Sequence, residues 1–494
     1  MYIVVSFSRL SLIVVLTLTL TLVGYHSSSS SSSSSSAAAA AADANTLELQ
    51  SSNDKGGPPT INDPRLKVDL VFKGLQFPTS MAFLGPNDIL VLEKNNGTVQ
   101  RIVNGHILPH PLLKVPVANK GETGMLGIAV AEHKNDNRPT YVFLYYTVSG
   151  GEKASGNSTT TNTIGGGSIQ PLGNRLYKYE FVNNSSNDKL INPKLLLTIP
   201  TSPKTPNHNG GKIIIGPDQN VYIVIGDTDE FYDQYFNHLS LTTKAQNFKN
   251  GSGPNGTGGI LRLTQDGKPV GKNIILSDKF PLDLYYAYGI RNSFGMDFDP
   301  VIKKLWDTEN GPAYGDEINL VEPGFNSGWA KVQGVWENNE SRKAGPIMLS
   351  PDPHILVDFG GRGKYRPPEL TWNVTVAPTG LAFVNSSKMG KQYENDMFVG
   401  DYLNGNLYHF KLKKNRTGLD LHGPLADTII SNPSEMQQVI FGHGFGRITD
   451  IKVGPDGYLY ILSVNPTAAG KEGTIFRISP ANIIMQLIPP FFIY

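Results

Sequence analysis

The segment TPNHNGGKIIIGPDQNVYIVIGD, residues 205–227, contains a histidine and an aspartate whose spacing allows acid–base chemistry. His208 lies in a glycine-rich loop before one apolar run, and Asp227 follows the next apolar run. If the two runs form an antiparallel hairpin, the chain returns to the end at which it started, so the two side chains can pair. A carboxylate on one imidazole nitrogen fixes the tautomer and makes the other nitrogen a general base. The alternative is that loop carbonyls satisfy His208 and that Asp227 caps a turn.

A second candidate is the pair Arg291-Asn292, which lies in the segment AYGIRNSFGMDFDP, residues 287–300. The pair comes just before an alternating apolar run, in a stretch with few other charges. A planar guanidinium in such a loop suits an anionic or carbonyl-rich ligand, because it donates several hydrogen bonds in a fixed plane. The alternative is that Arg291 only bridges two neighbouring sheets.

The third candidate is an irregular loop, TENGPAYGDEINLVEPGFNSGWA, residues 308–330. The stretch Asn310-Gly311-Pro312 is followed by Asp316-Glu317, which concentrates carbonyl and carboxylate oxygens in a short segment. Hard oxygen ligands of this kind suit calcium. The spacing does not match the EF-hand loop, and the two carboxylates could equally serve in turns or in contacts between sheets.

The elements that must position these loops recur along the chain from Leu66 onward. An alternating apolar strand leads to a turn and a second apolar strand, and copies of this unit begin at Thr79, Gly127, Gly211, Gly295, Gly380 and Thr449. A single small sheet cannot bury both of its faces. When the sheet is repeated, neighbouring copies can cover these faces, which predicts radial packing around an axis. We therefore predict an all-β fold, a six-bladed β-propeller over residues 64–480, with loops from several blades meeting at one mouth of an axial channel. A pair of β-sandwiches is the alternative.

Composition restricts the chemistry that such a site can use. Lys+Arg 43 against Asp+Glu 42 in 494 residues gives a formal net charge of +1, so nothing in the charge favours nucleic acid as a partner. Cys 0 excludes a disulfide framework, a thiolate metal site and a cysteine nucleophile. A metal would have to be held by oxygen or imidazole ligands.

The two ends of the chain differ from the repeats. Residues 1–24 hold one arginine before an apolar run, which predicts a signal peptide or an uncleaved membrane anchor. Residues 25–63 include a serine tract and an alanine run, which predict a disordered linker, and residues 481–494 form an apolar tail. We expect a secreted or extracytoplasmic glycoprotein, tethered to the membrane if the leader is retained. Asn-x-Ser/Thr sites support export: Asn96, Asn157, Asn183, Asn184, Asn250, Asn255, Asn339, Asn373, Asn385 and Asn415.

Taken in chain order, these segments resemble the soluble quinoprotein glucose dehydrogenase and aldose sugar dehydrogenase family, also called the glucose/sorbosone dehydrogenases. The resemblance runs from about Leu66 to Ile478. It rests on motifs in the family's order: His-x-Gly-Gly-Lys, Gly-Pro-Asp-Gln, Ile-Gly-Asp, Gly-x-Arg-Asn, Gly-Pro-x-x-x-Asp-Glu-Ile-Asn-Leu and Asn-x-Gly-Trp. It implies a six-bladed propeller that binds pyrroloquinoline quinone (PQQ) and Ca²⁺ and oxidises the anomeric carbon of aldoses to a lactone. The implied partners are a small-molecule sugar and an external electron acceptor.

The resemblance also implies roles for individual residues. His208 resembles the base that takes the proton from the anomeric hydroxyl while hydride passes to the quinone, and Asp227 the carboxylate that orients it. Arg291 resembles the arginine beside the quinone carbonyl that gains charge. The other implied cofactor contacts are Glu122, Asn292, Asn310, Thr375 and Arg447. Calcium is expected at the backbone carbonyls of Gly311 and Pro312, with Asp316 and Glu317 as further oxygen ligands.

Several positions depart from the family pattern. Glu122 stands where the family usually has Gln, and Asn310 replaces a Gln before Gly-Pro. Leu403 stands where glucose dehydrogenases carry a cofactor-binding lysine, and Thr449 where a second arginine often lies. PQQ bears several carboxylates, and each charge-assisted hydrogen bond lost is worth roughly 1.5–3 kcal/mol. Losing two cations would therefore raise the dissociation constant by about a few hundredfold.

These departures keep two other hypotheses open. One is a non-catalytic extracellular propeller that binds carbohydrate or protein and has lost its quinone. The other is a calcium-dependent hydrolase of the lactonase type, a chemistry that propellers also host. The hydrolase would need side-chain carboxylates around calcium on the propeller axis, and the sequence identifies no such ring.

Overall fold

The computed structural model describes residues 57–481 except 133–138, 151–170, 184–187, 203–205, 229–242, 272–274, 338–351 and 468–469. All of these residues belong to one compact unit, Ala40–Tyr494. The predicted leader at 1–24, most of the predicted linker and the tail from residue 482 lie outside the described residues. Within the described ranges, no helix is both long enough and apolar enough to cross a membrane.

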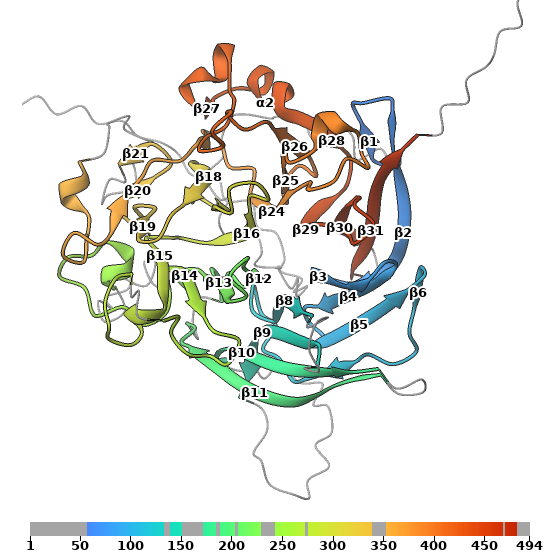
Figure 1. Ribbon diagram of the computed structural model, residues 1–494, viewed down its shortest axis with the longest axis horizontal. Coiled ribbons are helices and arrows are strands. Elements are labelled where there is room, and N and C mark those ends of the chain that lie inside the picture. The colour runs from blue at the N-terminus through green and yellow to red at the C-terminus, as the bar shows by residue number, and fades with distance from the viewer. Residues whose placement is uncertain are drawn as a thin grey trace, which may run out of the picture. The chain divides into compact units, whose positions relative to one another are not determined.

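The described residues form an all-β propeller, in which sheets follow one another around a centre (Figure 1). Each sheet is antiparallel over its inner strands, and the strand nearest the centre comes from the start of a sequence repeat. From the inner strand outward, the first sheet holds β3 (Pro78–Gly85), β4 (Asp88–Glu93), β5 (Thr98–Val103), β6 (His106–Ile107) and β7 (Leu113–Lys114). The next holds β8 (Met125–Ala131), β9 (Tyr141–Ser149), β10 (Pro171–Val182) and β11 (Lys189–Ile199). The third holds β12 (Ile213–Ile215), β13 (Val221–Ile225), β14 (Gly259–Leu263), β15 (Tyr285–Tyr288), β19 (Phe325–Asn326) and β22 (Lys364–Tyr365).

Three further sheets complete the circuit, again from the inner strand outward. One holds β16 (Ser293–Phe298), β17 (Leu305–Glu309), β18 (Asp316–Val321), β23 (Leu370–Trp372) and β27 (Ile429–Ile430). The next holds β24 (Pro378–Phe383), β25 (Met397–Asp401), β26 (Leu407–Phe410), β28 (Ile440–His443) and β1 (Thr60–Ile61). The last holds β29 (Arg447–Val453), β30 (Leu459–Thr467), β31 (Gly470–Pro480) and β2 (Leu66–Gln76).

Only short elements lie outside these sheets in the described part of the chain. A two-stranded ribbon pairs β20 (Val332–Gln333) with β21 (Trp336–Glu337). The α-helix α2 (Pro433–Val439) begins after Asn432, whose side chain accepts from the backbone N–H groups of Ser434 and Glu435. The remaining elements are 3₁₀ turns: Lys244–Gln246, Leu282–Leu284, Pro353–Ile355, Lys391–Tyr393 and Gly423–Asp427.

Each strand–turn–strand unit predicted from the sequence corresponds to the inner two strands of one sheet. The unit from Gly211, for example, forms β12 and β13, which pair antiparallel from Ile213–Ile223 to Ile215–Val221. Its Gly-Pro-Asp turn closes as expected, because the Gln219 N–H donates to the Gly216 carbonyl at 2.9 Å. Prolines and glycines therefore mark the strand ends that the pattern predicts.

Apolar contacts between neighbouring sheets form the core. Six clusters of buried side chains each join two adjacent sheets. Between the sheets of β16 and β24, for example, Trp306 and Trp372 pack with Tyr408 and Phe410. Burying one such side chain contributes roughly 1.5–3 kcal/mol. Each sheet is thus stabilised by both of its neighbours, as the repeat pattern requires.

The chain closes the propeller by pairing its first long strand with its last. Strand β2 runs antiparallel to β31 from the pair Leu66–Pro480 to the pair Gln76–Glu472. Earlier in the chain, Thr60 and Ile61 already pair with β28. Ladder pairing therefore fixes the chain from Thr60 onward, within the last residues of the predicted linker.

Candidate functional site

The loops at one end of the propeller bring the predicted site residues together. The inner strands begin at this end, and the turn after each second strand returns the chain to it. Hydrogen bonds between successive loops show that these strand ends meet, as from the Thr79 hydroxyl to the Met125 carbonyl at 2.8 Å. The predicted residues that precede, follow or begin strands at this end are Glu122, His208, Asp227, Arg291, Asn292, Asn310, Gly311, Pro312, Asp316, Glu317, Thr375 and Arg447.

His208 and Asp227 are in contact, as the hairpin argument predicts. His208 Nδ1 lies 2.6 Å from Asp227 Oδ1, and both residues are buried. The other carboxylate oxygen, Oδ2, accepts from the indole N–H of Trp329 at 2.6 Å. Because the carboxylate is an acceptor on both sides, Nδ1 is the ring nitrogen that donates to Asp227, which orients the ring and fixes the tautomer of a neutral imidazole. The arrangement is that of an oriented general base.

Gly226 allows the two loops to approach this closely. A Cβ at Gly226 would collide with the carbonyl oxygen of His208 and would lie 2.9 Å from that of Arg291. The next residue, Asp227, donates its N–H to the same Arg291 carbonyl at 2.8 Å. The glycine of the Ile-Gly-Asp motif therefore lets three chain segments share the space beside the histidine.

Glu122 points toward protein donors. Its Oε2 accepts from the backbone N–H of His208 at 2.6 Å and from the side-chain amide of Asn292 at 3.2 Å. The carboxylate that the sequence assigned to the cofactor is thus already paired with the loops around it.

Arg291 is held in place by a hydrogen bond from its backbone N–H, by an aromatic ring beside its guanidinium and by two backbone carbonyls. Its N–H donates to Glu309 Oε1 at 2.7 Å. The guanidinium lies 5.4 Å from the centroid of the Trp329 ring. Nη1 donates to the carbonyls of Asn310 and Gly311 at 2.9 and 3.0 Å. The same tryptophan therefore contacts both the carboxylate that orients His208 and the buried cation.

Three buried side-chain atoms of the predicted site residues have no hydrogen-bond partner among the described residues. They are Arg291 Nε, Asn292 Oδ1 and Asn310 Oδ1. An unsatisfied buried polar atom costs about 1–3 kcal/mol, so a bound group that supplies the missing partner is stabilised at each of these atoms. The set suits a ligand that supplies an oxygen to the guanidinium and a hydrogen-bond donor or a cation to the amide oxygens.

The loop before β18 is tied to the loop before β24 by the buried carboxylate of Asp316. Its Oδ1 accepts from the Gly311 N–H at 2.8 Å, and its Oδ2 accepts from the Thr375 hydroxyl at 2.7 Å. The backbone N–H groups of Val376 and Ala377 also donate to Oδ2, at 2.6 and 2.8 Å. Burial raises the pKa of this carboxyl. In the described structure Asp316 and Thr375 are therefore hydrogen-bonded to each other and hold the two loops together.

Glu317 lies in a second, deeper group of carboxyls. It accepts from Gln333 Nε2 at 3.0 Å, from Asn319 Nδ2 at 2.9 Å and from the Ser327 hydroxyl at 3.1 Å. The Ser327 hydroxyl lies 2.7 Å from Glu309 Oε2 as well. Burial raises the pKa of Glu317 to about 8, and burial and the charge of Glu317 raise that of Glu309.

The predicted calcium ligands do not form a metal centre of side chains. Among the residues that the structure describes, no group of three or more His, Asp or Glu is placed to hold a metal ion. The Gly311 carbonyl accepts from Arg291 Nη1, and Pro312 is half-buried beside it. Calcium at the Gly311 carbonyl would compete with that hydrogen bond.

The loops before β24 and between β25 and β26 carry exposed aliphatic groups, and the start of β29 carries one cation. The guanidinium of Arg447 lies 5.2 Å from the centroid of the Tyr402 ring. Leu403 is 56% exposed and Val374 is 55% exposed on adjacent loops, where the Leu403 N–H donates to the Val376 carbonyl at 3.3 Å. Thr449 donates its hydroxyl to the Leu462 carbonyl within its own sheet. The structure therefore offers no cation at 403 or 449.

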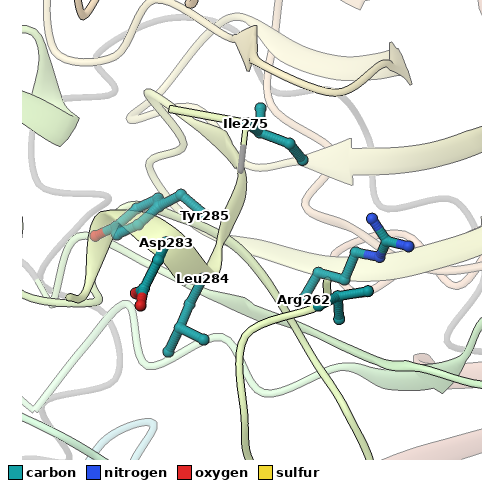
Figure 2. Close-up of a pocket in the computed structure, with 6 residues that line it drawn as sticks. Arg262, Ile275, Asp283, Leu284 and Tyr285 are labelled. Carbon is teal, nitrogen blue, oxygen red and sulfur yellow. The ribbon is translucent and has the colours of Figure 1, made fainter. Parts of the chain in front are cut away.

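A small cavity lies elsewhere, in the outer part of the sheet of β12. Its volume is about 10 Å³, and Figure 2 shows Arg262, Ile275, Asp283, Leu284 and Tyr285 around it. A space of this size holds about one water molecule. Burial raises the pKa of the Asp283 carboxyl there. The cavity is too small for a sugar or a cofactor.

Trp329 and Glu309 are parts of the site to which the sequence gave no role. The Asn-x-Gly-Trp motif drew attention to Trp329, but a motif does not indicate which residues the side chain contacts. Trp329 and Asp227 are 102 positions apart in the chain, and only the meeting of two loops joins them.

Comparison with known proteins gives a consistent result. A sequence model of the family described as glucose/sorbosone dehydrogenase matches residues 75–475. Aldose sugar dehydrogenase YliI of Escherichia coli K12 is 24% identical over 426 residues, which cover 86% of this chain and 94% of that protein. Quinoprotein glucose dehydrogenase B of Acinetobacter calcoaceticus is 29% identical over 279 residues, 55% of this chain and 53% of that protein.

Among solved structures, the PQQ-bound form of an aldose sugar dehydrogenase from Streptomyces coelicolor is similar to this chain. The match covers 85% of this chain and 100% of that one, with a TM-score of 0.54 and 22% identity. At that level of identity the similarity concerns the fold.

Proposed function

This chain belongs to the glucose/sorbosone dehydrogenase family, and we propose that it is an exported, PQQ-dependent sugar dehydrogenase. In this proposal it oxidises the anomeric carbon of an aldose to a lactone and passes the electrons to an external acceptor. The named relatives are sugar dehydrogenases, which supports an oxidoreductase. The observation that carries the proposal is the buried His208–Asp227 pair, which Trp329 joins to the Arg291 guanidinium at the loop end of a propeller.

In the proposed reaction, His208 acts as the general base. Its Nε2 takes the proton of the anomeric hydroxyl. At the same time, the hydrogen bonded to the anomeric carbon leaves as hydride, with both electrons of the C–H bond. Asp227 holds Nδ1–H and stabilises the imidazolium that forms. Trp329 holds the second carboxylate oxygen, so the carboxylate cannot rotate away from the ring. PQQ, when bound, supplies the acceptor for the hydride.

The atoms without partners support PQQ as the cofactor. Arg291 Nε would donate to a quinone or carboxylate oxygen, and the amide oxygens of Asn292 and Asn310 would accept from an N–H group or contact a cation. Arg447 would supply the second positive charge. Calcium at the Gly311 and Pro312 carbonyls is part of the proposal, and it requires the Arg291 guanidinium to release Gly311.

The architecture and the location complete the proposal. Each of the six larger sheets is taken as one blade of a six-bladed propeller. Export agrees with the apolar leader, and glycosylation is supported by Asn-x-Ser/Thr sites whose asparagines are exposed: Asn96, Asn183, Asn250, Asn385 and Asn415.

The test is reconstitution. Purified protein is titrated with PQQ and Ca²⁺ and assayed for aldose-dependent reduction of a redox dye. We expect activity only when both are present, and we expect His208→Gln to reduce kcat by about 100- to 10,000-fold with unchanged thermal unfolding. An unaffected rate in His208→Gln would remove the assignment of the base. Loaded, folded protein that oxidises none of a broad panel of aldoses would refute the proposal.

The other two hypotheses predict different outcomes. A binding propeller would take up no PQQ but would still bind a glycan or protein. A lactonase would hydrolyse lactones with Ca²⁺ alone. No specific observation in the described structure favours either.

A further inference from the structure

We propose that Glu122 is a positioning residue: its carboxylate holds the His208 loop and the Asn292 amide in register instead of contacting the cofactor. The catalytic part of this inference rests on the proposed function. The structural part concerns the loop alone and is tested separately.

The contacts of Glu122 form a two-way clamp on the histidine loop. The backbone N–H of Glu122 donates to the Pro206 carbonyl at 2.9 Å. In return, Glu122 Oε2 accepts from the His208 N–H at 2.6 Å, with the Asn209 N–H near it at 3.4 Å. Main chain and side chain of one residue therefore fix both sides of the loop that carries the base.

The loop needs such a clamp because His208 is held in an unusual conformation. Its φ is 54°, in the left-handed region that residues with a Cβ rarely occupy. A backbone in this region persists only when its surroundings fix it. On the other side of the residue, the Thr228 N–H donates to the His208 carbonyl at 3.2 Å. Glu122 supplies the partner for the His208 N–H.

The same carboxylate joins three neighbouring sheets. Glu122 precedes β8, His208 precedes β12 and Asn292 precedes β16. Asn292 Nδ2 lies 3.2 Å from Glu122 Oε2 and 3.5 Å from Oε1. With Nδ2 directed to Glu122, the amide oxygen of Asn292 is left for a ligand, and it has no partner among the described residues. Glu122 thus sets the direction of one proposed cofactor contact without being one.

A carboxylate performs this task better than the glutamine usual in the family. Two backbone N–H groups and the Asn292 amide nitrogen converge on Oε2, and Oε1 lies 3.5 Å from the same amide nitrogen. A charged oxygen accepts more strongly than a neutral amide oxygen. A glutamine oxygen in the place of Oε2 would be a neutral, weaker acceptor, and the glutamine NH₂ group in the place of Oε1 would lie 3.5 Å from the NH₂ group of Asn292. The N–H groups also offset the negative charge, which reduces repulsion of an anionic cofactor.

The experiment compares Glu122→Gln with Glu122→Asp. The aspartate keeps the charge but shortens the reach, so it separates positioning from charge. The matched control is Glu180→Gln on β10, which removes a carboxylate that accepts from Asn192 Nδ2 at 2.7 Å on the exposed outer part of a sheet. The measurements are amide hydrogen exchange of the peptide containing His208 and Asn209 in cofactor-free protein, PQQ affinity by titration, and kcat and KM for an aldose.

Positioning predicts that both Glu122 variants exchange the His208 and Asn209 amides about tenfold faster and lose about tenfold in kcat. PQQ affinity should fall by about three- to tenfold, because the Asn292 amide loses its direction, while KM should stay within about threefold of the wild type and Glu180→Gln should change nothing. A direct cofactor contact predicts the reverse: tighter PQQ binding in Glu122→Gln and wild-type exchange rates. That result would overturn the inference, and so would wild-type behaviour of Glu122→Asp in every measurement. If the wild type binds no PQQ and oxidises no aldose while exchange still accelerates, the proposed function fails and the structural role of Glu122 stands.

Discussion

At the scale of single residues, the histidine is controlled through its ring and through its backbone by different partners. Asp227 and Trp329 act on the ring, and Glu122 acts on the main chain. Trp329 has a second contact, because its ring lies beside the Arg291 guanidinium. The indole N–H and the ring face can be separated by mutation, since phenylalanine keeps only the face.

We expect Trp329→Phe to reduce kcat by about 10- to 100-fold with little change in PQQ affinity. The variant loses the hydrogen bond to Asp227 Oδ2, and hydrogen bonds to charged groups contribute roughly 1.5–3 kcal/mol. It keeps an aromatic face beside the guanidinium. The measurements are dye-linked turnover and PQQ titration, with Trp336→Phe as a control on β21. Equal turnover in Trp329→Phe and wild type would show that Asp227 needs no second partner.

A second residue-scale feature is the buried carboxyl of Asp307 on β17. Burial raises its pKa to about 7 in the folded chain, against about 3.9 when exposed. Between about pH 4 and pH 7 the folded chain therefore holds a proton that the unfolded chain has released. The unfolding free energy consequently falls as the pH rises through this window.

Asp307→Asn should remove that dependence, because asparagine does not ionise. Relative to the wild type, we expect the variant to gain roughly 1–4 kcal/mol of unfolding free energy between pH 5 and pH 8, at 1.36 kcal/mol per pKa unit. Urea denaturation at the two pH values measures the difference. Parallel stability profiles for the two proteins would mean that Asp307 ionises freely in the folded state.

At the scale of elements, the loops decide how well a charged cofactor is held. The turn between β25 and β26 presents Leu403, and the loop before β24 presents Val374, both exposed. The chain belongs to the glucose/sorbosone dehydrogenase family. Of the three positions 403, 447 and 449, however, only Arg447, at the start of β29, carries a positive charge.

Leu403→Lys should therefore strengthen PQQ binding. A new charge-assisted hydrogen bond of roughly 1.5–3 kcal/mol would lower the Kd by about 10- to 100-fold. Val374→Lys is the matched control, because it adds the same charge at equal exposure on the adjacent loop. Equal gains in both variants would indicate general attraction instead of a specific contact, and no gain in Leu403→Lys would mean that PQQ does not reach this loop.

Elements also explain which parts of the molecule could be predicted from the sequence. Alternating apolar residues and proline-marked turns predicted the inner two strands of every sheet, because these strands face packed neighbours on both sides. The pairing of His208 with Asp227 followed from hairpin geometry. The orientation of Glu122 and the contact of Trp329 with Asp227 did not follow, because both depend on loops from different sheets. The outer pairings of β23 with β27 and of β15 with β19 are parallel and join distant segments, which no local pattern indicates.

At the scale of the whole molecule, the ring depends on its closure. Strand β2 pairs with β31, and Leu75 of β2 is fully buried with Ile475 and Met81 at the contact with the first sheet. Without β2, the last sheet loses its outer strand and β31 becomes an exposed edge. Every sheet is stabilised by two neighbours, so the loss of one strand destabilises the adjacent sheets as well.

Two truncations test this dependence and the N-terminal boundary of the folded domain. A protein that starts at residue 57 keeps β1 and β2, and we expect its melting temperature to stay within about 2 °C of the full chain. A protein that starts at residue 77 loses β2, and the loss of buried leucines alone costs about 2–5 kcal/mol each, so we expect an insoluble or non-cooperatively melting product. Soluble yield and thermal unfolding distinguish the two. If the shorter protein melts cooperatively at the temperature of the longer one, closure does not stabilise the ring, and the boundary of the folded domain lies after β2.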